Sequence, residues 1–140
     1  MEPLDLSKAH PRRAREELAG IIFLPRSIDK ARALLPGGVA NGYTIEGFSE
    51  KMLDTLKIPV ADFMALVARA QSDDDVAAYV VEHAAPGGAE AWNAGVLKRE
   101  LYQGNREEAI AENPWLADHP EIKLSLDFLQ YREDHGLDND

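Results

Sequence analysis

Four charged side chains follow one another at helical spacing in the segment 24–38, LPRSIDKARALLPGG. Residues three and four apart are neighbours on a helix surface, so Arg26 would face Asp29 and Lys30. Asp29 would in turn face Arg32. Arg26 would also lie in the first turn of this helix, where free backbone N–H groups favour an anion and a guanidinium adds a forked contact. The segment therefore indicates either a surface that binds an anion or a solvent-exposed helix face that carries weak ion pairs.

A second group of arginines precedes this segment, in the run HPRRAR at residues 10–15. If this run packs beside the next helix, Arg12 or Arg15 would converge with the cations there on a pocket for phosphate or carboxylate. The alternative is a solubilising first turn that faces water. The expected partner of such a pocket is a small anionic ligand or an acidic protein surface. The candidate anion-binding residues are Arg12, Arg15, Arg26, Asp29, Lys30 and Arg32.

No arrangement in the sequence is typical of a catalytic or metal centre. The chain has no cysteine, and its four histidines show neither an i, i+4 pair nor the carboxylate spacing of known metal sites. The acids of SDDD at residues 72–75 would point in different directions around a helix and are typical of a helix N-terminus. We therefore predict no catalytic residue, no metal and no cofactor.

Three functions remain open from the residues alone. The first is a non-catalytic binding or interaction module that uses the Arg-rich N-terminal surface. The second is an enzyme acting on a small phosphorylated or carboxylated metabolite, with Arg26 and Arg32 fixing the anion and Asp29 as acid or base. The third is a purely structural role, in which the charged motif ties helices together.

The charge of the chain limits its partners. Its 140 residues carry a formal net charge of -10, although residues 1–35 hold seven basic and five acidic side chains. Nucleic-acid binding requires a surplus of Lys and Arg facing the phosphates, so nucleic acid is not an expected partner. No apolar run is long enough for a membrane span or a signal-peptide core, and the lack of cysteine suits a reducing compartment. We therefore expect a cytoplasmic protein without a membrane partner, and the sequence does not indicate its oligomeric state.

Helical periodicity dominates, and no segment has the alternation or β-branched content of a strand. We therefore predict an all-α fold, a single-domain irregular bundle of about six to eight short helices. An extended arm at residues 1–10 precedes the helical domain at 11–135, and a frayed tail at 136–140 follows it. The expected helices cover residues 11–19, 25–35, 49–57, 59–70, 72–84, 89–102, 105–113 and 120–136, with Ser49 as the cap of the third.

Two stretches of the sequence resemble one protein family. The segment LPRSIDKARALLPGG resembles the signature LPRxIDKxRA of the small bacterial proteins with the domain of unknown function numbered 5069, and residues 5–20 match a preceding DLxxxxPRxxxxxLxG pattern. The segments SDDDVAAYV, EAWN and HPEIKLSLDFLQ are similar to later parts of the family in order and spacing, so the resemblance extends from residue 5 to residue 131. The run KLSL at residues 123–126 departs from the family, where a threonine and an aromatic pair are more usual. The resemblance implies a compact helical bacterial protein and no particular reaction.

Overall fold

The computed structural model describes residues 1–137, which form seven α-helices, two short 3-10 helices and one pair of strands. The α-helices are α1 (Leu24–Ala33), α2 (Phe48–Leu56), α3 (Val60–Arg69), α4 (Asp73–His83), α5 (Gly88–Lys98), α6 (Arg106–Glu112) and α7 (Ser125–Asp134). The 3-10 helices are η1 (Leu101–Gly104) and η2 (Pro114–Asp118), and the antiparallel strands are β1 (Glu17–Leu18) and β2 (Ile21–Ile22). The predicted bundle of six to eight short helices is therefore confirmed, with a small hairpin added to it.

Helices α2, α3 and α4 form where the apolar spacing predicts them. In α3, Phe63 and Val67 lie four residues apart on one face and are both fully buried. Ser72 caps α4, because its hydroxyl accepts a hydrogen bond from the backbone N–H of Asp75 (3.3 Å). The buried faces of α1 to α5 and of α7 meet in the main core of the chain.

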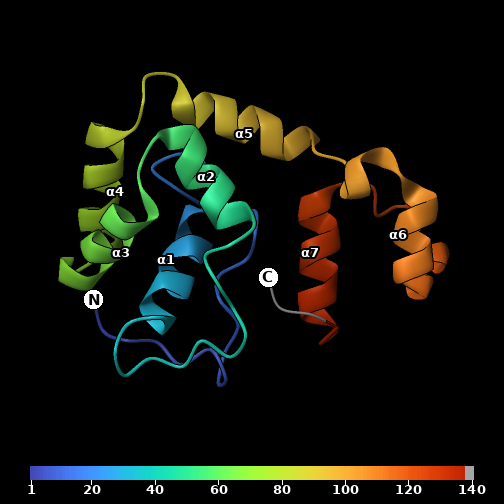
Figure 1. Ribbon diagram of the computed structural model, residues 1–140, viewed down its shortest axis with the longest axis horizontal. Helices are drawn as coiled ribbons and strands as arrows, with labels where there is room; N and C mark the ends of the chain where they lie inside the picture. Colours follow the sequence, from blue (N-terminus) through green and yellow to red (C-terminus); the bar gives the residue numbers. More distant parts are fainter. Residues whose placement is uncertain (138–140) are drawn as a thin grey trace.

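Helix α1 lies within this core, covered by other elements (Figure 1). Every residue from Ile21 to Ala31 is buried, including Arg26, Asp29 and Lys30. Helix α3 packs against α1, and so does the hairpin of β1 and β2. A solvated face on this helix, one of the two interpretations of its charges, is therefore wrong.

Residues 11–19 do not form the predicted helix. They make turns and then enter β1, which is joined to β2 by a two-residue turn at 19–20 with φ angles of 53° and 73°. Two positive φ angles in succession suit a tight hairpin. The backbone N–H of Arg12 donates to the carboxylate of Asp29 (2.8 Å), and that of Ala14 donates to a side chain of α7 (2.8 Å). Because these donors are satisfied by distant parts of the chain, the segment needs no helix to satisfy them.

Helix α5 leads from the region of α2 to a smaller part of the chain that contains α6 and α7 (Figure 1). It ends at Lys98, four residues before the predicted end, because the chain beyond it pairs with residues 123–125. The backbone N–H of Ser125, for example, donates to the carbonyl of Arg99 (2.8 Å). Residues 120–121 form a turn and the same pairing engages residues 123–124, so the last helix begins five residues later than predicted. A second, smaller core lies here, made of Leu101, Ala109, Leu116, Ile122 and Phe128.

In the part of the chain that the structure describes, no helix combines the length and the apolar character needed to cross a membrane. The predicted frayed tail covers residues 136–140, of which 138–140 lie outside the described residues.

Candidate functional site

The guanidinium group of Arg26 is in the protein interior, with 0% of the residue exposed. It forms a forked ion pair with Glu133 of α7, in which Nη1 donates to Oε1 (3.1 Å) and Nη2 donates to Oε2. Nη1 also donates to the backbone carbonyl of Arg12 (3.1 Å), and the Tyr43 hydroxyl donates to Oε2 of Glu133 (2.8 Å). Charge-assisted pairs of this geometry are among the strongest hydrogen bonds in proteins. The pair therefore fixes α1 to α7 through the core.

The surroundings of Glu133 keep its carboxyl group ionised. Burial by itself raises the pKa of this group, since the residue is only 3% exposed. The hydrogen bonds and charge of Arg26, together with the hydroxyl of Tyr43, outweigh burial and lower the pKa of Glu133 below its ordinary value. The pKa of Tyr43 is raised by burial and by its hydrogen bond to Glu133, so Tyr43 remains a neutral donor.

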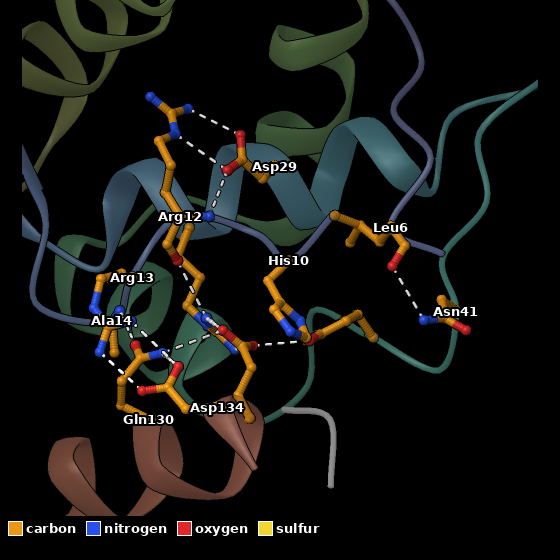
Figure 2. A network of polar contacts seen from close by, with 12 residues as sticks. Leu6, His10, Arg12, Arg13, Ala14, Asp29, Asn41, Gln130 and Asp134 are labelled. Atoms are coloured by element: carbon orange, nitrogen blue, oxygen red, sulfur yellow. Dashed lines mark hydrogen bonds and ion pairs between the residues drawn. The ribbon is translucent and has the colours of Figure 1, made fainter. Parts of the chain in front are cut away.

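Arg12 forms a second polar network where the N-terminal segment meets α1 (Figure 2). Its Nε and Nη2 donate to the two carboxylate oxygens of Asp29 (3.1 and 3.0 Å), and its Nη1 donates to Asp73 of α4 (2.6 Å). Burial lowers the pKa of Arg12, but the hydrogen bonds that it donates to Asp73 and Asp29, together with the charges of these carboxylates, have the larger combined effect and raise it. Arg12 therefore stays charged and links the N-terminal segment to α1 and α4.

Arg13 and Arg15 connect the same segment to α7. Arg13 donates to both carboxylate oxygens of Asp134 (3.2 and 3.1 Å), as Figure 2 shows. Arg15 donates in the same way to Asp127 (3.0 and 3.2 Å). Both pairs are open to solvent, because at least 37% of each of the four side chains is exposed. Pairs of this kind contribute little to stability one by one.

The structure brings only some of the six candidate anion-binding residues together. Arg26 donates to the backbone carbonyl of Arg12, and Arg12 binds Asp29, so these three residues form one continuous network. Arg15 belongs to a different place, on the surface against α7. In all three arginines the guanidinium group donates to a carboxylate of the chain itself.

The other two candidates, Lys30 and Arg32, lie further along α1. Lys30 is fully buried, and its Nζ lies 5.5 Å from the centre of the Phe23 ring, within reach of a cation–π contact. Arg32 is half-buried, and its Nε donates to the backbone carbonyl of Glu2 (2.8 Å). An anion-binding role for the six residues stays a prediction.

The arginine–carboxylate network is suited to holding elements together. Its members come from the N-terminal segment, α1, α4 and α7, and each contact joins two of these. Within residues 1–137 no group of three or more histidine, aspartate or glutamate side chains converges in a way that could hold a metal ion.

A surface groove of about 590 Å³ lies between α2 and α5. Its apolar lining includes Phe48 from α2 and Trp92 and Val96 from α5. Gly95 of α5 also borders it, and a Cβ atom placed on Gly95 would meet no atom of the described chain within 4 Å. The groove is therefore open above the middle of α5.

Helices α2 and α5 approach each other closely at the N-terminal end of α5. A Cβ atom placed on Gly88 would lie 3.1 Å from the carbonyl oxygen of Thr55 and 3.4 Å from the Cα of Leu56. The backbone N–H of Ala85 also donates to the carbonyl of Leu56 (2.9 Å). Glycine at position 88 thus permits the close approach of α2 to the beginning of α5.

Four basic side chains and one acidic side chain line this groove. They are Lys51, Lys57, Lys98, Arg99 and Asp54. Among the described residues, none of the four cations has a carboxylate within 4.0 Å. In a chain with a net charge of -10, this concentration of unneutralised cations makes the groove a local positive region.

Two of these cations are held in place by an aromatic ring. The Nζ of Lys51 lies 5.3 Å, and the Cζ of Arg99 5.7 Å, from the centre of the Phe48 ring. The Phe48 ring itself packs edge-on against Phe23, with 5.8 Å between the ring centres. The charges of Lys51, in α2, and of Arg99, directly after α5, therefore both lie against the Phe48 ring.

The groove residues were not among the candidates from the sequence. Lys51 and Lys98 belong to helices that are separated along the chain by α3 and α4, so their spacing carries no pattern. The one local signal was Gly95, an isolated glycine inside an otherwise helical segment, where glycine costs about 1 kcal/mol relative to alanine.

The fold and these two features define a small, mostly helical protein with an internal arginine–carboxylate network and a cationic surface groove. Residues 8–134 match the family described as the domain of unknown function DUF5069, and the chain belongs to this family. The family inferred from the sequence is therefore confirmed. A comparison with curated proteins gives no match for this chain.

Proposed function

We propose that this protein is a binding module for a small anionic ligand, which it holds in the groove between α2 and α5. The observation that carries the proposal is the group of four cations around one groove, none of which has a carboxylate partner among the described residues. The groove volume of about 590 Å³ is typical of small-molecule sites.

Helix dipoles account for part of this charge without a ligand. Lys57, Lys98 and Arg99 lie at the carboxyl ends of α2 and α5, where a cation is favoured. Lys51 lies in the first turn of α2, where the dipole opposes a cation. An anion bound between Lys51 and Arg99 would stabilise both side chains, and this supports a ligand in addition to the dipole effect.

An anion site at the Arg-rich N-terminal surface is the second candidate. The proximity of Arg12 and Arg26 at the start of α1 favours it. It is the weaker of the two, because a ligand there would have to displace Asp29 and Glu133 from these guanidinium groups. The same contacts support a structural role for the charged motif.

The proposal does not include a reaction. Among residues 1–137, the one hydroxyl-bearing side chain that lines the groove is Thr55, which donates to the backbone carbonyl of Lys51 (2.9 Å). The acidic residue there, Asp54, is not hydrogen-bonded to that hydroxyl, so the groove lacks the nucleophile–base pair that an enzyme of this kind would use.

The proposal is tested by thermal unfolding of the full chain with phosphate, citrate, ATP and benzoate. The double variant Lys51→Gln, Lys98→Gln removes two groove charges. The control, Lys8→Gln with Arg69→Gln, removes two exposed charges that do not line the groove. We expect at least one anion to raise the melting temperature of the native chain and of the control, and not that of the groove variant.

A ligand at 100 times its Kd adds about 2.7 kcal/mol to the free energy of unfolding. In a chain of this size, that corresponds to a rise of roughly 5–10 °C in the melting temperature. If no anion raises it, or if the groove variant responds like the control, this function is wrong.

A further inference from the structure

Gly95 lies in the interior of α5, where glycine destabilises a helix by about 1 kcal/mol relative to alanine. The ordinary structural reasons for a glycine do not apply at this position. Its φ angle is not positive, and among the described atoms none would lie within 4 Å of an added Cβ. Gly88 in the same helix, by contrast, is required by its contact with Thr55. The effect of Gly95 in the structure is to keep the groove open above α5.

The residues that line the groove next to Gly95 are apolar; Ala91 is exposed, and Trp92 and Val96 are only 6% and 3% exposed. Trp92 and Val96 border it on α5, and Ala91 adds a methyl group one turn before Gly95. The indole N–H of Trp92 is directed into the fold, where it donates to the backbone carbonyl of Ile22 (2.7 Å). A ligand that lies over this surface gains free energy by covering apolar atoms.

The cations of the groove lie beside this apolar base. Lys98 follows Gly95 by three residues and is therefore on the same face of α5. Lys51 and Arg99 are fixed against the Phe48 ring, and a guanidinium group can also stack on a flat ring of a ligand. The groove thus combines an open apolar floor with positive charge at its edge.

We infer that the ligand of this groove is an organic anion with a flat apolar body, of the class of aromatic carboxylates and sulfonates. The body lies over Gly95, and the anionic group meets Lys51, Lys98 and Arg99. This inference rests on the proposed function and adds the class of ligand to it.

The test is a fluorescence titration of the full chain with 8-anilinonaphthalene-1-sulfonate, an aromatic anion whose emission rises on burial. Gly95→Leu fills the open space, and Gly95→Ala adds a single methyl group as the matched control. Both substitutions improve helix propensity, so both variants are expected to melt at or above the temperature of the native chain. A loss of binding in Gly95→Leu therefore does not come from unfolding.

We expect Gly95→Leu to raise the Kd of the probe at least tenfold and Gly95→Ala to change it less than threefold. The double variant Lys51→Gln with Lys98→Gln should raise the Kd at least fivefold. If the lysine variant weakens binding and Gly95→Leu leaves the Kd within twofold, the flat apolar ligand is wrong, while anion binding in the groove stands. If Gly95→Leu weakens binding and the lysine variant does not, the site is apolar and both proposals are wrong. Absence of saturable binding overturns the inference, and the thermal screen then decides the proposed function separately.

Discussion

Replacing Glu133 with Gln tests whether the buried ion pair with Arg26 holds the fold together. Glu133→Gln keeps the size of the side chain and an acceptor for Tyr43, and it removes the negative charge that faces the guanidinium group. Arg26 is 0% exposed, so water cannot replace the lost partner. Removing one member of a buried ion pair costs about 3–5 kcal/mol, a large fraction of the roughly 5–15 kcal/mol that stabilises a typical domain. We expect a loss of this size in the free energy of unfolding, measured by urea titration with circular dichroism.

The neighbouring residue Asp134 provides the control. Its pair with Arg13 lies on the surface, with 37% and 60% of the two side chains exposed, so Asp134→Asn should cost less than about 1 kcal/mol. Equal losses in Asp134→Asn and Glu133→Gln would refute the argument. Replacing both members of the buried pair, by Arg26→Met with Glu133→Leu, should recover most of the stability that Glu133→Gln loses.

The same pair also predicts a dependence on pH. The pKa of Glu133 is lower in the folded protein than its ordinary value of 4.5, so the stability that this group contributes is complete above that value. It is lost as the pH falls through the lower pKa of the folded state. The difference in unfolding free energy between the native chain and Glu133→Gln should therefore shrink below pH 4.5. A difference that stays constant from about pH 7 to about pH 3 would contradict the assignment of the charge to Glu133.

Two further predictions concern the other polar contacts of the network. Arg12→Ala should lower the free energy of unfolding by about 1–2 kcal/mol, because Arg12 is two-thirds buried and binds two carboxylates. Arg15→Ala removes an exposed ion pair and should change the free energy of unfolding by less than about 0.5 kcal/mol. If Arg12→Ala and Arg15→Ala lose the same free energy of unfolding in the urea titration, burial does not determine how much each arginine contributes to stability. Tyr43→Phe should cost about 1.5–3 kcal/mol, because it removes a hydroxyl donor from the charged and buried Glu133. Thermal unfolding checks this second prediction, and an unchanged melting temperature would contradict it.

Much of the fold could be predicted because its signals are local. The spacing of Phe63 and Val67 indicates one face of α3, and Ser72 marks the start of α4 through a hydrogen bond to its own first turn. The burial of the charges on α1 could not be predicted in this way. Arg26 and Glu133 are separated by 107 residues, and a local pattern contains no information about such a partner.

The segment 11–19 shows the same limit for the backbone. Pro11 is compatible with the first turn of a helix, which is the basis of the prediction there. In the folded chain, the N–H of Ala14 instead donates to Gln130 of α7, 116 residues later. A tertiary contact has replaced the local hydrogen bonds that a helix would use.

The groove could not be predicted because packing creates it. Lys51 and Arg99 are ordinary surface positions when each helix is considered alone. They become neighbours only because α2 packs on α5, which brings both charged groups within cation–π distance of the Phe48 ring. The candidate site from the sequence was placed at the densest run of charge along the chain, whereas the four groove cations lie on, or directly after, two helices that are far apart in the sequence.

The distance along the chain between Arg26 and Glu133 also has a consequence for synthesis on the ribosome. A ribosome that adds roughly 5–20 residues per second needs about 5–20 s to make the 107 residues that separate them. Throughout this interval the guanidinium group has no countercharge from α7, and its hydration opposes entry into an apolar interior. Burial of Arg26 in an ion pair therefore becomes possible only after Glu133 has been made.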